Sequence, residues 1–257
     1  MGFLAVGADR LWYDDSGGEG VPLVMLHPGI TDSRIWDPLL PQLVGRRLIR
    51  FDRRGFGRSP RATEPYSALG DLVAVLDALE LERAHLVGNS MGGETSLALA
   101  VTAPSRVASM TLLCPGIGGY PWPDGDDDPE LEARWKAAKE AGDLAALAAI
   151  QIGYWLASGS DDYLDAEVLA STQLDNSPAA SFEHDNPEQW ASLDRLAVPT
   201  TVIAGELDPP DSLQASIDLA AKIPGAVLVR LPVDHVPQYR EPGEVAEVIL
   251  ATADRAT

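Results

Sequence analysis

The chain has 257 residues, 46% of them hydrophobic, which is enough to bury the core of one α/β domain. A formal net charge of −20 argues against nucleic-acid binding, because phosphate contacts need clustered Lys and Arg. No stretch approaches the roughly 20 apolar residues of a membrane span, and the start lacks a signal-peptide pattern, so we expect a cytoplasmic protein that does not bind membranes.

Short apolar runs rich in β-branched residues alternate with segments of helical period. Residues 3–17 predict an antiparallel hairpin around a Gly-Ala-Asp turn. Six further strands are predicted at residues 22–28, 47–55, 83–89, 107–115, 199–207 and 226–232, and helices at 69–81, 96–104, 212–223 and 242–256. This alternation is typical of βα units built on a parallel sheet.

The segment from about Gly118 to Trp190 interrupts the alternation. It contains helical patterns separated by Pro, Gly and Asp but no convincing strand, and it is too long for an ordinary connection. We therefore expect an insertion with its own structure. Four of the six tryptophans lie in it, each expected to pack the insertion onto the main body and together indicating an apolar lid: Trp122, Trp135, Trp155 and Trp190. The acidic stretch at 123–130 lacks the ligand spacing of an EF-hand, so we expect a solvated loop.

A strand runs directly into residues 88–92, Gly-Asn-Ser-Met-Gly, and a helix follows. This is G-x-S-x-G in the strand-turn-helix context that gives the pattern its meaning. The turn holds the hydroxyl of Ser90 at the carboxyl edge of the sheet and aims the free N–H groups of the helix at the same spot. Ser90 is the predicted nucleophile.

A serine hydroxyl needs a base to remove its proton, and a histidine oriented by a carboxylate is the usual solution. Two histidines follow Ser90 in the chain. His184 lies inside the irregular insertion, whereas His235 directly follows the last predicted strand, where parallel sheets place chemistry. His235 is the predicted base.

Several carboxylates could orient that histidine. The strand at 199–207 ends beside Glu206, Asp208 and Asp211. Asp208 is preferred because the following prolines would project it toward the histidine loop, and Asp211 is better explained as the N-cap of the next helix. Asp234 adjoins the histidine, but neighbouring side chains seldom face each other, so we expect an exposed loop carboxylate.

An oxyanion hole needs two backbone donors. Met91, which follows the nucleophile, should supply one, and the loop after the strand at 22–28 should supply the other. Pro28 has no N–H, so Gly29 is the first candidate and Ile30 the second. His27 precedes the serine and is expected to order the loop.

With these residues in place, the sequence resembles the α/β-hydrolase superfamily, in particular its lid-bearing esterases and enol-lactonases. The resemblance rests on five segments. They are the first loop at 27–36, the segment Asp-Arg-Arg-Gly-Phe-Gly-Arg-Ser at 52–59, the serine turn, the acid turn at 205–211 and the histidine loop at 234–242. It implies a mostly parallel eight-stranded sheet flanked by helices, with a helical cap inserted after strand 6. The core would then be residues 1–117 and 191–257, and the cap residues 118–190.

The resemblance also implies roles. The residue two positions after His27 would be the second oxyanion donor, which is Gly29, whereas Asp52 and Arg54 would brace the sheet edge. Pro28 and Asp234 depart from the family, which usually has glycine at both places. Ser90, His235 and Asp208 would cleave a carboxylic ester or lactone of a small molecule, with Gly29 and Met91 holding the oxyanion.

Three alternatives stay open. Carbon–carbon bond hydrolases share the serine turn, but they usually have Gly-Pro-Gly in the first loop and Trp after the histidine, where this chain has Gly29-Ile30-Thr31 and Val236. An elimination or cyclisation enzyme would use the same pocket. A non-catalytic ligand receptor would have no need of all three site residues.

No cofactor and no metal are expected. Cys114 is the only cysteine, which excludes an internal disulfide and a multi-cysteine zinc site, and the chain has no closely spaced pair of histidines. The expected partner is a small-molecule substrate. The sequence leaves the oligomeric state open, a homo-oligomer included.

Overall fold

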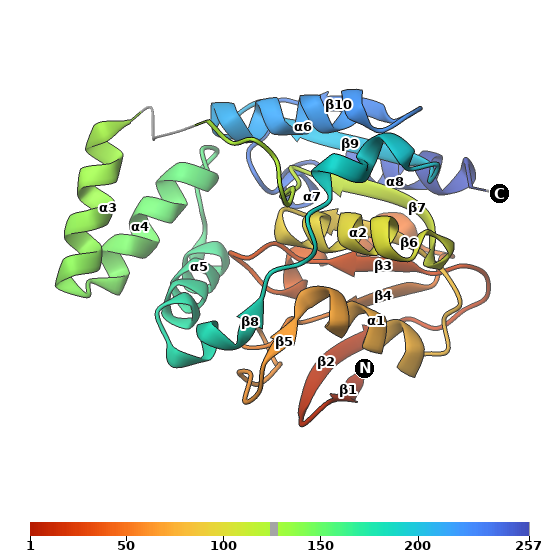
Figure 1. Cartoon of the computed structure of the whole chain (residues 1–257), viewed down its shortest axis with the longest axis horizontal. Coiled ribbons are helices and arrows are strands. Elements are labelled where there is room, and N and C mark those ends of the chain that lie inside the picture. Colours follow the sequence, from red (N-terminus) through yellow and green to blue (C-terminus); the bar gives the residue numbers. More distant parts are fainter. Residues whose placement is uncertain (124–127, 257) are drawn as a thin grey trace.

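The computed structural model describes residues 1–123 and 128–256. Its centre is an eight-stranded sheet with the order β1-β2-β4-β3-β6-β7-β9-β10 (Figure 1). The strands are Gly2–Val6 (β1), Asp9–Asp15 (β2), Leu23–Leu26 (β3), Leu48–Phe51 (β4), Ala84–Asn89 (β6), Val107–Leu113 (β7), Thr200–Gly205 (β9) and Val227–Leu231 (β10). The strands from β4 to β10 in this order pair in parallel, and β1 and β2 form the predicted antiparallel hairpin.

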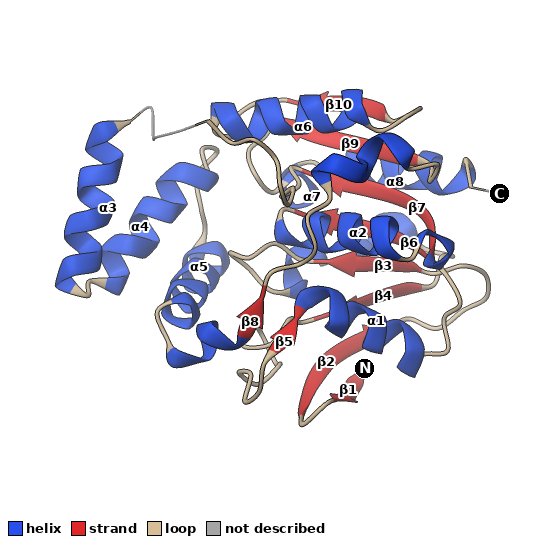
Figure 2. Ribbon diagram, in the orientation of Figure 1, coloured by secondary structure: helices blue, strands red, loops and turns tan. Residues whose placement is uncertain are grey.

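Helices cover both faces of the sheet (Figure 2). One face carries Ala68–Ala78 (α1), Met91–Thr102 (α2) and Pro210–Lys222 (α6). The other carries Pro242–Asp254 (α8) and the short helices Ser33–Trp36 (η1) and Leu40–Leu43 (η2). Two small helices, Pro104–Arg106 (η3) and Pro237–Arg240 (α7), lie in connections. The mostly parallel sheet flanked by helices is confirmed.

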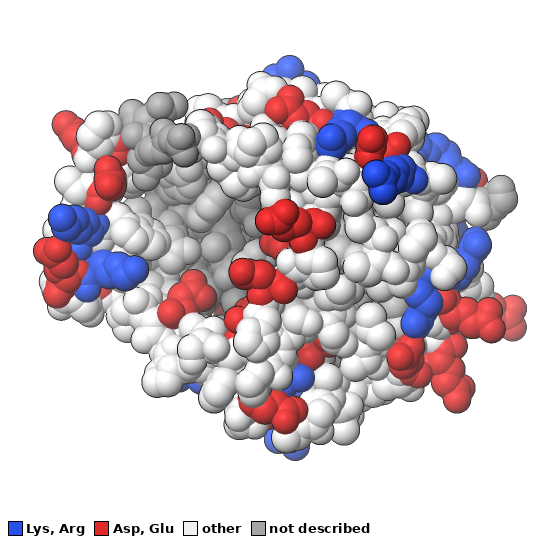
Figure 3. Space-filling model, viewed as in Figure 1, with Lys and Arg blue, Asp and Glu red and all other residues white. Residues whose placement is uncertain are grey.

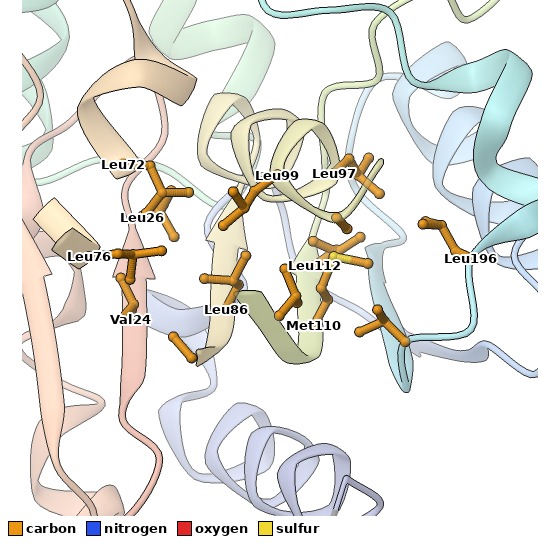
Figure 4. Close-up of a cluster of buried hydrophobic side chains, with 14 of the residues drawn as sticks. Val24, Leu26, Leu72, Leu76, Leu86, Leu97, Leu99, Met110, Leu112 and Leu196 are labelled. Carbon is orange, nitrogen blue, oxygen red and sulfur yellow. The ribbon is translucent and has the colours of Figure 1, made fainter. Parts of the chain in front are cut away.

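Side chains of each parallel strand alternate between two separate cores. Val24 and Leu26 of β3 point into the core beneath α1 and α2, whereas Leu23 and Met25 point into the core beneath α8. Figure 4 shows the first core, with Leu97 and Leu99 of α2 facing the strands. Because both faces are buried, the strands are apolar throughout, which is why the sequence predicted them well.

The residues between β7 and β9 lie beside the sheet. They form Pro129–Ala141 (α3), Leu144–Trp155 (α4), Asp162–Asp175 (α5), Pro178–Phe182 (η4), Glu183–His184 (β8) and Trp190–Arg195 (η5). A left-handed Gly142 ends α3, and Asp143 caps α4 by accepting from the N–H of Ala146 at 3.0 Å. In Figure 1, α3 lies outermost, against α4, and β7 is the sixth strand of the main sheet in chain order.

The expectation that this region contains no strand was wrong, because β8 pairs in parallel with Tyr66–Ser67 (β5). A two-residue strand has no periodicity that a sequence could reveal. The acidic stretch expected to be a solvated loop falls mainly at 124–127, outside the described residues.

The four tryptophans of the insertion differ in their surroundings. Trp190 packs edge-on against Tyr120, with ring centroids 4.9 Å apart, and lies under the amine of Lys222. Trp122 and Trp135 are 45% and 39% exposed, so the expectation that each packs onto the main body was wrong for Trp135 on the outer helix α3. None of the described helices has the length and hydropathy needed to cross a membrane.

Candidate active site

Ser90 lies between β6 and α2. Its backbone has φ 52° and ψ −118°, a conformation that residues other than glycine rarely adopt. Its N–H donates to the carbonyl of Leu113 at 3.0 Å, which ties the turn to β7. A Cβ on Gly92 would lie 2.1 Å from the carbonyl oxygen of Leu26, and one on Gly88 would lie 2.4 Å from that of Gly92. Glycine is therefore required on both sides of the serine, as the G-x-S-x-G pattern predicts.

His235 and Asp208 meet at the carboxyl edge of the sheet. Nδ1 of His235 lies 2.8 Å from Oδ1 of Asp208, and the two side chains are 5% and 0% exposed. An ionised carboxylate can only accept, so Nδ1 carries the proton in this contact and Nε2 lies on the opposite edge of the ring. The structure thus brings together the predicted base and the preferred acid.

The other carboxylates considered do not reach the imidazole. Glu206 is exposed and pairs with Arg230 at 3.0 Å. Asp211 is not the N-cap it was expected to be, because α6 begins earlier, at Pro210. Proline suits a first helical position, where no N–H acceptor is needed, and Asp211 lies in the first turn, where its charge favours the helix dipole.

Asp234 was expected to be exposed, and this was wrong. It is fully buried, with two hydrogen bonds to the guanidinium of Arg240 at 3.0 and 2.7 Å, and it accepts from the N–H of Ser158 at 3.0 Å. Arg240 lies six residues after Asp234, so the histidine loop folds back on itself when the two side chains pair. Asp234 therefore joins the histidine loop to the segment after α4.

Asn89 also holds the histidine loop, a role that sequence reasoning missed. Its Nδ2 donates to the carbonyls of Leu113 and His235 at 2.9 and 3.0 Å, and its Oδ1 accepts from Gln238 at 2.9 Å. All of these groups are buried. The residue before the nucleophile thereby sets the distance between the serine turn and the histidine loop, and its amide at that position is the signal that was overlooked.

Trp155, at the end of α4, packs on the imidazole. The two ring centroids are 4.3 Å apart with an interplanar angle of 38°, and the carbonyl of Trp155 accepts from the N–H of His235 at 3.3 Å. The sequence placed Trp155 in the insertion but gave no sign of this contact. The insertion therefore touches the predicted base directly.

A cavity of about 330 Å³ lies at this site. Its wall includes Ser90, His235 and Trp155, and also both predicted oxyanion donors, Gly29 and Met91. A Cβ on Gly29 would lie 2.3 Å from Sδ of Met91, so a larger residue there would require the Met91 side chain to move. Ile30 lines the cavity too, so both candidate donors of the first loop are near.

Part of the wall of this cavity is polar. The guanidinium of Arg53 pairs with Glu183 of β8 at 2.5 Å, and the hydroxyl of Tyr66 donates to the same carboxylate at 3.0 Å. Burial and the charge of Glu183 raise the pKa of Tyr66, so the phenol stays protonated. His184, the alternative base, is exposed on β8 and is not among the described residues that line the cavity.

His27, Asp52 and Arg54 are structural, as expected. Nε2 of His27 accepts from the N–H of Arg53 at 3.0 Å, so the proton is on Nδ1, which donates to the carbonyl of Pro28 at 2.8 Å. Burial lowers the pKa of His27 and keeps the ring neutral. Asp52 accepts from two backbone N–H groups, and Arg54 forms buried pairs with Asp9 and Asp71.

Cys114, Asp208 and His235 place ligand-type atoms within 4.8 Å of one another, the one such group among the described residues. A thiol binds metal as the thiolate. Burial and the charge of Asp208 raise the pKa of Cys114 well above its ordinary value, and the imidazole is already bonded to the carboxylate. These three residues are therefore poorly suited to hold a metal ion.

Known proteins share this arrangement of elements. The family described as alpha/beta hydrolase fold matches residues 21–242. The 2-hydroxymuconate semialdehyde hydrolase of Pseudomonas sp. (strain CF600) is 33% identical over 261 residues, covering 93% of this chain and 90% of the relative. The 3-oxoadipate enol-lactonase 1 of Acinetobacter baylyi is 30% identical over 211 residues, covering 76% and 74%.

Among solved structures, Est816, described as an N-acyl homoserine lactone degrading enzyme, matches with a TM-score of 0.76 and 30% identity, covering 97% of this chain and 99% of that one. The family match spans most of the chain and includes the serine turn, the acid turn and the histidine loop. The chain belongs to the α/β-hydrolase family and is a hydrolase.

Proposed function

We propose that this hydrolase cleaves a carboxylic ester or lactone of a small molecule through an acyl-enzyme formed on Ser90. One observation carries the proposal: the buried 2.8 Å contact between His235 and Asp208 lies at the wall of the cavity that Ser90 also lines. A nucleophile, a base and an orienting acid from three distant segments thus share one site, which is the arrangement that acyl transfer needs.

In the first step, Nε2 of His235 accepts the proton of Ser90 as Oγ attacks the carbonyl carbon. The N–H groups of Gly29 and Met91 hold the developing oxyanion. When the tetrahedral intermediate collapses, the carbon–oxygen bond to the leaving alcohol breaks and His235 returns the proton to that oxygen. A water molecule, deprotonated by His235, then releases the acid and regenerates Ser90.

In this proposal residues 118–190 form a cap over the site, and residues 1–117 and 191–257 form the core that carries the chemistry. Gln151 and Trp155 of α4 and Leu174 of α5 supply part of the cavity wall. The contact between Trp155 and His235 joins the two parts. A cap of this kind excludes water and selects the substrate, and these are the roles that we assign to it.

Carbon–carbon bond cleavage is the second candidate. It is favoured by the similarity to a 2-hydroxymuconate semialdehyde hydrolase over almost the full chain. Gly29-Ile30-Thr31 and Val236 stand against it, since they depart from the loop and histidine patterns expected of that group. Activity on a vinylogous diketone exceeding that on every ester and lactone tried would favour this candidate.

Fluorophosphonate labelling tests the nucleophile. We expect one adduct, on Ser90, and loss of p-nitrophenyl acetate hydrolysis by at least about 10⁴-fold in Ser90→Ala. An adduct elsewhere, or a Ser90→Ala protein as active as the wild type, contradicts the mechanism. Absence of both adduct and turnover, together with tight binding of a small ligand, would indicate a receptor.

A further inference from the structure

A second hollow, of about 250 Å³, lies between α3 and α4 in the insertion. Five of its six lining residues are apolar or aromatic, namely Leu131, Trp135, Ile150, Tyr154 and Trp155, and the sixth is Gln151. We call the space between α3 and α4 the α3–α4 hollow, and it has no part in the mechanism described above. Figure 3 shows that the surface is also hollowed between this arm, at the left of the view, and the body.

The α3–α4 hollow adjoins the cavity that contains Ser90. Gln151 and Trp155 line both spaces. They are four residues apart on α4 and so share one face of that helix. Gln151 is held from behind by a 2.9 Å bond from Nε2 to Oγ1 of Thr172, and Trp155 is held by the imidazole of His235. One face of α4 therefore borders both the cavity that contains Ser90 and the hollow.

The cavity and the hollow present different groups to a substrate. Part of the cavity wall is formed by the ion pair of Arg53 and Glu183 with the hydroxyl of Tyr66. An alkyl chain placed against these groups would remove water from charges without offering them a hydrogen bond, which is unfavourable. None of the described residues that line the α3–α4 hollow is charged, and the hollow adjoins the cavity at Gln151 and Trp155.

Trp135 gives that hollow an unfilled apolar surface. It is on α3, where Ala138 is the one buried residue, and its side chain is 39% exposed. Large exposed aromatic side chains at a concave surface commonly mark binding sites. A chain of methylene groups lying along the indole would remove apolar area from water on both partners.

We propose that the α3–α4 hollow binds an unbranched alkyl chain of the substrate while its carbonyl carbon lies at Ser90. The inference rests on the proposed ester or lactone hydrolysis and narrows its substrate class to molecules with a medium-length alkyl chain. The polar part of the cavity wall, at Arg53, Tyr66 and Glu183, would then contact the other, polar part of the molecule. Trp135 and Leu131 are specificity-determining residues in this arrangement.

Two series of substrates test the proposal and show which side of the scissile bond carries the chain. One series is p-nitrophenyl esters from acetate to decanoate, and the other is n-alkyl acetates from methyl to octyl. Each methylene that enters the hollow should raise kcat/KM roughly fourfold, until the hollow is filled. The wild-type protein should show this rise in one of the two series.

Trp135→Ala should lower kcat/KM for the member of that series with an eight-carbon chain by about tenfold and leave its shortest member within twofold, because only long chains reach the hollow. Trp135→Phe should restore most of the loss. Trp122→Ala is the matched control, since Trp122 is 45% exposed and does not line the hollow. It should leave the profile unchanged.

If kcat/KM does not change with chain length in either series, while p-nitrophenyl acetate is hydrolysed, the inference is overturned and the proposed function stays intact. An equal loss at all chain lengths in Trp135→Ala, with an unchanged melting temperature, would also overturn it. Undiminished acetate hydrolysis in Ser90→Ala would instead contradict the proposed function itself. The three results are distinct, so each hypothesis can fail separately.

Discussion

The histidine loop and the helix α3 are built in opposite ways. Around His235, the side chains of Asn89, Asp208 and Asp234 are all buried and each has hydrogen-bond partners. Along α3, one residue is buried, and the apolar cluster that joins α3 to α4 has three buried members. Groups that transfer a proton must keep their positions within tenths of an ångström, whereas a surface that binds an alkyl chain can adjust its shape.

The largest expected effect concerns the acid in the first of these regions. Asp208→Asn should lower kcat for p-nitrophenyl acetate by about 10⁴-fold with the fold unchanged, because the amide no longer accepts the Nδ1 proton and favours the wrong tautomer. Asp211→Asn is the control and should stay within twofold, since Asp211 lies on α6 away from the imidazole. Steady-state kinetics and circular dichroism decide the matter, and equal rates in the two variants would refute the role of Asp208.

The next effect is on stability. Asp234→Ala should lower the free energy of unfolding by about 3–5 kcal/mol, because it leaves Arg240 and the N–H of Ser158 without their buried acceptor. Asp77→Ala removes an ion pair whose carboxylate is 60% exposed and should cost about 1 kcal/mol or less. Urea unfolding measures both. Similar values for the two variants would show that the histidine loop is no more tightly constructed than the surface.

A smaller effect is expected where the segment between β7 and β9 meets the body of the sheet. Glu183→Gln weakens the pairing with Arg53 and should cost about 1.5–3 kcal/mol, since hydrogen bonds to charged groups contribute about that much. Faster amide hydrogen exchange should follow in α5 and β8, with β6 unaffected. Uniform acceleration through both regions would instead mean that the insertion and the sheet unfold together.

The smallest effect concerns Cys114, in the most protected part of the site. Its thiol is buried, and burial together with the charge of Asp208 raises its pKa, so the thiol form persists well above neutral pH. We expect no reaction with a thiol reagent at pH 8 in the native protein and one modified thiol after unfolding in guanidinium. Rapid modification of the native protein would reveal opening of the sheet edge beneath His235.

Short-range features of the chain predicted the parallel sheet and the turn at Ser90. Strands buried on both faces are apolar throughout, so their sequences identify them. Gly-x-Ser-x-Gly between a strand and a helix indicates one particular tight turn. The start of α2 was predicted five residues late, because Gly92 and Gly93 have poor helical propensity and only the strained turn before them makes the helix begin there.

Other features depended on which segments meet in space. The sequence offered three carboxylates near one strand end, and only the parallel pairing of β7, β9 and β10 determines that Asp208 faces His235. Burial of Asp234, the contact of Trp155 with the imidazole and the pairing of β5 with β8 likewise join residues far apart in the chain. Local sterics and hydrophobic periodicity are written in consecutive residues, whereas the partners of a buried polar group are chosen only when the whole chain has packed.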